Sequence, residues 1–166
     1  HPEITSEVRR LFKGLEKKVF YKDYKCLIVS PLETRNKIYS LIDIEIKNAK
    51  ERKPAYMILK MNSLADEDMV QKLYEASSAG VKIQLIVRGM CTLIPGLPGL
   101  SENIEVTSII DKYLEHARVW IFANGGDEKI FLTSADLMTR NLDHRVEVGF
   151  PILNENIRKE IRDIIN

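Results

Sequence analysis

The chain has 166 residues, of which 45% are hydrophobic and 30% are charged, a composition typical of one globular domain and not of a disordered segment. Its 25 basic and 24 acidic residues give a net charge of +1, so the overall charge does not indicate a nucleic-acid-binding protein. A polyanionic ligand would therefore need a local cluster of cations.

Cysteine content and hydropathy further narrow the possible class of protein. Cys26 and Cys91 are too few for a disulfide framework, and we expect them to be buried thiols in a reducing compartment. No apolar run approaches the roughly 18 residues of a membrane span, and the first residues lack the apolar region of a secretory signal. Because the sequence starts at His1 and not at Met, we expect a piece of a longer polypeptide.

The first half of the chain alternates helical and extended patterns. It predicts a helix over residues 4–15, a strand over 24–29, a helix within 33–52, a strand over 56–61, a helix from 63 to 79 and a strand over 81–87. Thr5 or Ser6 would cap the first helix, and Ser63 with Asp66 has the pattern of a capping box for the third. This alternation predicts a parallel sheet covered by helices, an α/β fold.

The second half is richer in short strands. It predicts a loop over residues 91–103, strands over 104–110, 118–122, 129–133 and 145–150, and a helix over 157–165. The residues Asn124-Gly-Gly-Asp127 join two of these strands and indicate a hairpin.

Several common catalytic motifs are absent from the sequence. There is no P-loop, no GxGxxG after a strand, no HExxH and no GxSxG. The three histidines, His1, His116 and His144, are scattered and do not suggest a zinc site.

His116 and Arg118 form one candidate site. In an extended segment, side chains two residues apart share a face, so the imidazole and the guanidinium would lie together. An imidazole can move a proton or attack phosphorus, and a guanidinium can hold phosphate oxygens. A single His-x-Arg is a weak motif, however, and its spacing alone favours a strand-edge histidine beside a solvent-facing arginine.

Three further arginines could join this site. Arg88 ends a predicted strand, where ligands gather in open α/β sheets, although it could be an ordinary surface residue. Arg140 and Arg145 lie in a polar stretch after another strand. Ser134 and Asp136 of the same stretch could simply cap a turn. The sequence alone does not place these side chains together.

Four stretches together resemble the C-terminal region of the polyphosphate kinase family. They are Glu75–Val81 (EASSAGV), Leu85–Pro95 (LIVRGMCTLIP), Tyr113–Val119 (YLEHARV) and Ser134–Arg145 (SADLMTRNLDHR). The likeness runs from about Glu7 to Pro151. It implies a phospholipase D-like domain with a mixed, mostly parallel sheet and helices on both faces. Residues 1–20 would be a helical connection from an upstream domain, and 21–166 the second catalytic domain.

The resemblance also implies roles for particular residues. His116 matches a histidine that lines the active site opposite a phosphorylated histidine of the upstream domain, and Arg88 and Arg145 match cations that contact nucleotide phosphates. Arg118 and Arg140 are added on charge and spacing. The phospholipase D pattern has lysine where this chain has Arg118, which argues against cleavage of lipid or DNA diesters.

The implied reaction is transfer of the terminal phosphate of ATP to inorganic polyphosphate. Mg²⁺ would be bound mainly by the part of the enzyme outside this chain. The expected partners are ATP or ADP, polyphosphate and the upstream domains, and nucleic acid is not among them. The enzyme would assemble into a homo-oligomer. It would be cytoplasmic and could lie at the periphery of the inner membrane face. A phosphodiesterase half-domain and a non-catalytic dimerisation module are the alternatives.

Overall fold

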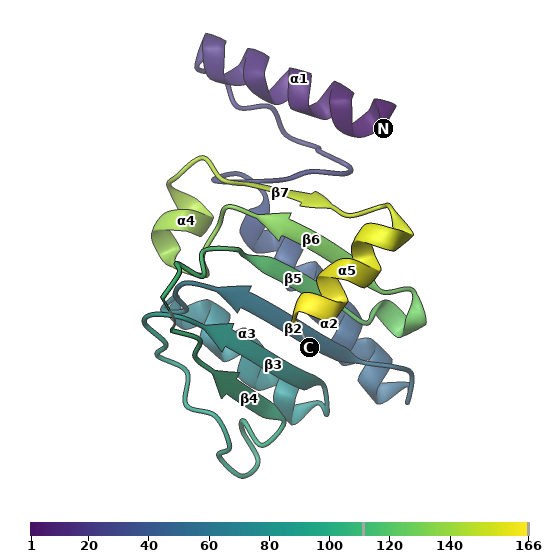
Figure 1. The fold of residues 1–166 in the computed structure, drawn as a ribbon, viewed down its shortest axis with the longest axis vertical. Coiled ribbons are helices and arrows are strands. Elements are labelled where there is room, and N and C mark those ends of the chain that lie inside the picture. The colour runs from purple at the N-terminus through teal and green to yellow at the C-terminus, as the bar shows by residue number, and fades with distance from the viewer. Residues whose placement is uncertain (111, 166) are drawn as a thin grey trace.

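The computed structural model describes residues 1–110 and 112–165 as one mixed sheet flanked by helices (Figure 1). The helices are α1 (Pro2–Lys17), α2 (Thr34–Lys50), α3 (Glu67–Ser78), α4 (Thr139–Asp143) and α5 (Glu155–Ile165), with a 3-10 turn η1 at Asn124–Gly126. The strands are β1 (Ile28–Val29), β2 (Tyr56–Met61), β3 (Lys82–Val87), β4 (Ile104–Thr107), β5 (Val119–Phe122), β6 (Lys129–Thr133) and β7 (Val148–Pro151). The predicted α/β class is confirmed.

The sheet has the order β1-β7-β6-β5-β2-β3-β4 in the part of the chain described. Strands β2, β3 and β4 are parallel, as the alternation of strand and helix predicts. The other neighbouring strands pair antiparallel, because β5 and β6 form the predicted hairpin and β7 returns beside β6. The sheet is therefore mixed as expected, but antiparallel pairs outnumber parallel ones.

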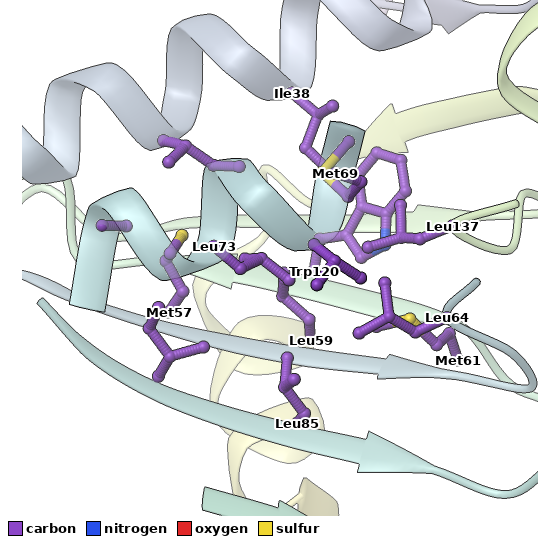
Figure 2. Packing of buried hydrophobic residues seen from close by; sticks show 14 of the residues in the cluster. Ile38, Met57, Leu59, Met61, Leu64, Met69, Leu73, Leu85, Trp120 and Leu137 are labelled. Atoms are coloured by element: carbon purple, nitrogen blue, oxygen red, sulfur yellow. The ribbon is translucent and has the colours of Figure 1, made fainter. Parts of the chain in front are cut away.

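Helices α2 and α3 cover one face of the sheet and bury the larger apolar cluster (Figure 1). Figure 2 shows Met69 and Leu73 of α3 against Leu59 of β2 and Trp120 of β5, with Ile38 of α2 nearby. Leu59 and Trp120 are fully buried. The central strands are held by this cluster.

Helix α5 lies across the opposite face (Figure 1). Its residues Ile161 and Ile165 pack against Ile58, Ile121 and Ile130 of the central strands. The apolar side chains of β2, β5 and β6 thus alternate between two covered faces, as strand geometry requires. None of the described helices is long and apolar enough to cross a membrane.

Backbone amides before β1 bond to carboxylates and not to another strand. Glu7 of α1 accepts hydrogen bonds from the N–H groups of Lys25, Cys26 and Leu27 at 2.6, 3.0 and 2.8 Å. Glu33 accepts those of Asp23 and Tyr24 at 2.9 and 3.3 Å. For this reason the strand predicted over residues 24–29 is shortened to Ile28–Val29, and α1 is attached beside it.

Two predicted helix caps are wrong. Thr5 and Ser6 lie inside α1, whose N-cap is His1. Asp66 is the N-cap of α3 and accepts a hydrogen bond from the Met69 N–H at 3.0 Å, so Ser63 is not the cap. The two free cysteines are half-buried, and not fully buried as expected.

Candidate functional site

The candidate residues lie at one end of the central strands, on the side where Figure 1 shows α4. Arg88 follows β3, and Arg118 precedes β5, whose antiparallel pairing with β2 brings its start to the same end. Asp136 follows β6, and Arg145 precedes β7. The topology alone therefore collects residues from widely separated parts of the sequence at one edge.

Arg88 is held at this edge by its backbone. Its N–H donates to the Met61 carbonyl at 3.3 Å, and the next amide, of Gly89, donates to the Asn62 carbonyl at 2.7 Å. A Cβ atom at position 89 would lie 3.1 Å from that carbonyl, so this close approach favours glycine. The Arg88 side chain is half-buried and makes no ion pair with any described residue.

Arg118 is paired with Asp136, which sequence reasoning did not foresee. Its Nε donates to Asp136 Oδ1 at 2.8 Å and its Nη2 to Oδ2 at 3.3 Å, and the two side chains are only 11% and 8% exposed. Burial acts to raise the pKa of Asp136, but the hydrogen bonds from Arg118 and from the Asn62 amide hold that pKa below its usual value. Asp136 is thus a charged partner of Arg118 and does not cap α4, whose N-cap is Met138.

His116 is exposed and lies alongside the Arg118 guanidinium. Nη1 is 3.5 Å from His116 Nδ1, Nη2 is 3.4 Å from Nε2, and Nη1 also donates to the His116 carbonyl at 3.1 Å. Both chain neighbours of His116 are tied to Lys60, whose Nζ lies 3.1 Å from Glu115 Oε2 and 3.3 Å from the Ala117 carbonyl. The histidine is held through its backbone while its ring faces solvent.

Ser134 is exposed but joins two buried polar side chains beside this edge. Its hydroxyl donates to Glu147 Oε2, and Asn141 Nδ2 donates to Glu147 Oε1 at 2.7 Å. Ser134 Oγ also accepts the Val148 N–H at 3.1 Å, which links β6 to β7. Glu147 and Asn141 were not predicted, although Asn141 lies within the polar stretch that drew attention to the region.

Arg140 and Arg145 are exposed on and after α4. The Arg145 N–H donates to the Arg140 carbonyl at 2.9 Å, and neither guanidinium forms an ion pair among the described residues.

Helix α4 itself is anchored by Arg35 of α2. The Arg35 guanidinium donates to Asp143 Oδ1 at 3.0 Å and to both carboxylate oxygens of Asp66 at 2.7 Å, and Thr139 Oγ1 donates to Asp66 Oδ2 at 2.7 Å. This anchor fixes the base from which Arg140 and Arg145 project.

The arrangement differs from the predicted site in one respect. Arg88, Arg140 and Arg145 are cations without an acidic partner among the described residues, and an anion would relieve their unpaired charge. Arg118, in contrast, has its charge balanced by Asp136. His116 contacts Arg118 directly, whereas Arg88 is linked to the pair through Asn62, whose amide donates to Asp136 Oδ1 at 2.9 Å.

The described residues do not form a complete metal site. They contain no group of three or more His, Cys, Asp or Glu side chains that could surround an ion. Three carboxylates beside the candidate residues, those of Glu115, Asp136 and Glu147, already accept hydrogen bonds from other side chains. These residues alone therefore do not fit Mg²⁺.

The mixed sheet with helices on both faces (Figure 1) has the fold of phospholipase D-like proteins. NucT from Helicobacter pylori matches 84% of this chain and 91% of its own with a TM-score of 0.59 and 17% identity. Nuc from Salmonella typhimurium, a phospholipase D family member, matches 82% of this chain and 90% of its own with a TM-score of 0.57 and 14% identity. At these identities the likeness concerns the fold alone.

The chain belongs to the polyphosphate kinase family. Residues 27–166 match the family described as Polyphosphate kinase C-terminal domain 2. The polyphosphate kinases of Escherichia coli K12 and Vibrio cholerae are each 49% identical to it, over 98% and 99% of this chain but only 24% and 23% of their own lengths. The polyphosphate kinase structure from Porphyromonas gingivalis has a TM-score of 0.93 and 44% identity, covering 99% of this chain and 25% of that one. This chain thus spans about a quarter of these relatives.

Proposed function

We propose that this chain supplies one wall of the active site that transfers the terminal phosphate of ATP to inorganic polyphosphate. The observation that supports the proposal is an exposed histidine with a tethered backbone, located at the strand ends that also carry Arg88 and Arg145. Phosphoryl transfer needs mainly positioning and neutralisation of the charge on the phosphate oxygens. An imidazole and free guanidinium groups at the same end of the sheet would meet both needs.

Each group has a separate part in the proposed reaction. Arg88 and Arg145 would bind phosphate oxygens, and Arg140 would add positive charge at the rim. A histidine outside this chain would accept the phosphate from ATP and pass it to the polyphosphate end. His116 would donate a hydrogen bond or a proton to the transferred group and would not be the nucleophile.

The remaining parts of the proposal concern the rest of the enzyme. Residues 1–20 would connect an upstream domain to residues 21–166, and that domain would supply the phosphorylated histidine. Mg²⁺ would be held mainly outside this chain. We also propose a cytoplasmic enzyme that assembles into a homo-oligomer and does not bind nucleic acid.

Kinetics of the full-length polyphosphate kinase that contains this chain test the proposal. Arg88→Ala and Arg145→Ala should each raise the KM for ATP by about 10- to 100-fold, because each removes a charge-assisted hydrogen bond to phosphate. Arg9, which is exposed on α1 away from the strand ends, provides the matched control as Arg9→Ala. Hydrolysis of a phosphodiester reporter without polyphosphate synthesis would instead favour a phosphodiesterase half-domain. A KM unchanged in both site variants would favour a non-catalytic module.

A further inference from the structure

Arg118 is built into the protein in a way that does not suit a ligand for phosphate. Three of its five N–H donors already point at protein oxygens: two at Asp136 and one at the His116 carbonyl. Its side chain is 11% exposed, and the opposing carboxylate is as deeply buried. A phosphate group could use only the two remaining donors, whose nitrogens lie 3.5 and 3.4 Å from the His116 ring. To form a bidentate pair through Nε it would have to displace Asp136 and leave that buried carboxylate without its partner.

Asp136 is in turn fixed by the central strands. Its Oδ1 accepts the amide of Asn62, at the end of β2, in addition to Arg118 Nε. Asn62 also accepts the Gly89 amide at 2.7 Å and so holds the turn that carries Arg88. One carboxylate therefore connects the end of β2, the start of β5 and the turn after β3.

The guanidinium that Asp136 holds lies alongside the imidazole of His116. The two ring nitrogens point in different directions, so the imidazole cannot accept in-plane hydrogen bonds at both nitrogens from one guanidinium. The contacts of 3.5 and 3.4 Å therefore indicate that the planar guanidinium is stacked against the planar ring. Such a contact restricts rotation of the ring but leaves a ring nitrogen available to a substrate. An exposed histidine needs this restraint if it is to meet a phosphate group in one orientation.

We propose that Asp136 is a positioning residue that holds Arg118 against His116, so that Arg118 orients the imidazole and does not bind phosphate. The inference rests on the proposed function and deepens it. Arginine is required at position 118 because its planar fork can meet a carboxylate, a carbonyl and an imidazole at once, whereas a lysine ammonium is a single point of charge. The phosphate-binding charge of this chain then comes from Arg88, Arg140 and Arg145.

Kinetics of the same full-length enzyme distinguish orientation from phosphate binding. Arg118→Lys keeps the positive charge, and Asp136→Asn keeps the shape of the side chain. Both should lower kcat by about 10- to 100-fold, the usual effect of losing a group that orients a reacting residue, with the KM for ATP within about twofold. Glu128→Gln is the matched control because it alters another arginine–carboxylate pair, with Arg162, at the opposite end of β6 from Asp136.

Two results would overturn the inference. A rise in KM for Arg118→Lys as large as that for Arg88→Ala would identify Arg118 as a phosphate ligand. A kcat within about twofold of the unaltered enzyme in both variants would show that the pair orients nothing.

A second measurement on the 166-residue chain separates failure of this inference from failure of the proposed function. The His116 ring signals are followed by NMR, and binding of inorganic tripolyphosphate is titrated. Asp136→Asn should shift and sharpen the His116 signals as the ring gains mobility, while tripolyphosphate affinity stays within about twofold. The control Glu128→Gln should leave the His116 signals in place. Unchanged His116 signals in Asp136→Asn would overturn the inference whatever the enzyme does. Absence of tripolyphosphate binding in the unaltered chain would count against the proposed function alone.

Discussion

Asp66 joins three elements that support the candidate site, and replacing it with asparagine should destabilise the protein in a pH-dependent manner. Its carboxylate receives both arms of Arg35 and the Thr139 hydroxyl and caps α3 through the Met69 amide. Asparagine can still cap the helix, so Asp66→Asn removes the charge and keeps the cap. The variant therefore isolates the ionic contribution.

The magnitude follows from the pKa of Asp66, which the bonds from Arg35 lower from 3.8 to about 2 in the folded protein. Since one pH unit corresponds to about 1.4 kcal/mol, the charged form stabilises the fold by about 2.5 kcal/mol. Asp66 is a buried residue, 2% exposed, so solvent screens this interaction little. For a domain of this size the melting temperature should fall by roughly 5–10 °C.

The sign of the pH dependence is fixed by the lowered pKa. The stabilisation is complete above the ordinary pKa of 3.8 and is lost as the pH falls through about 2. The deficit of Asp66→Asn should thus be about 2.5 kcal/mol at pH 7 and about half of that at pH 3.

Urea unfolding of the 166-residue chain, followed by fluorescence of the buried single tryptophan, Trp120, measures these values. Asp66→Ala serves as the companion variant and should cost about 1 kcal/mol more, because it also removes the cap. A deficit equal at pH 7 and pH 3 would refute the electrostatic account.

Three further outcomes are expected. His116→Ala in the full-length enzyme should lower kcat by about two to four orders of magnitude. Because the His116 side chain is exposed, the melting temperature should stay unchanged. Unaltered kinetics would show that His116 is an ordinary strand-end residue. The 166-residue chain alone, incubated with labelled ATP and magnesium, should form neither phosphohistidine nor polyphosphate, and either product would show that the nucleophile lies within it. Leu59→Ala should lower the free energy of unfolding by about 2–5 kcal/mol in urea titrations, since the Leu59 side chain of β2 is fully buried in the larger apolar cluster. A loss below about 1 kcal/mol would contradict close packing in that cluster.

Much of the fold could be predicted because its signals are local. The apolar run at Tyr56–Met61, preceded by Pro54, predicts β2 with the bounds observed, and Asn124-Gly-Gly-Asp127 correctly predicts the turn between β5 and β6. The shortening of β1 could not be predicted in this way. It depends on Glu7 and Glu33, which reach backbone amides up to twenty residues away.

The site shows the same division between local and distant signals. The candidate positions stand out individually as charged residues beside predicted strand ends. Which cations are free is decided by partners elsewhere in the sequence. Asp136 lies 18 residues beyond Arg118, and Lys60 lies 55 residues before Glu115. No spacing rule connects such positions, so Arg118 and Arg145 look alike in sequence although only Arg118 is neutralised in the fold.

The position of β5 and β2 in the middle of the sheet bears on how the candidate site can open. Strand β5 has β2 on one side and β6 on the other, and its start carries Arg118. Fraying begins at edge strands, here β1 and β4, and freeing the base of His116 would require separation of the central pair. Amide hydrogens of β2 and β5 should therefore exchange only through global unfolding. Separation of the strands beneath the site is therefore a global event, and the histidine has a rigid foundation in the central pair of the sheet.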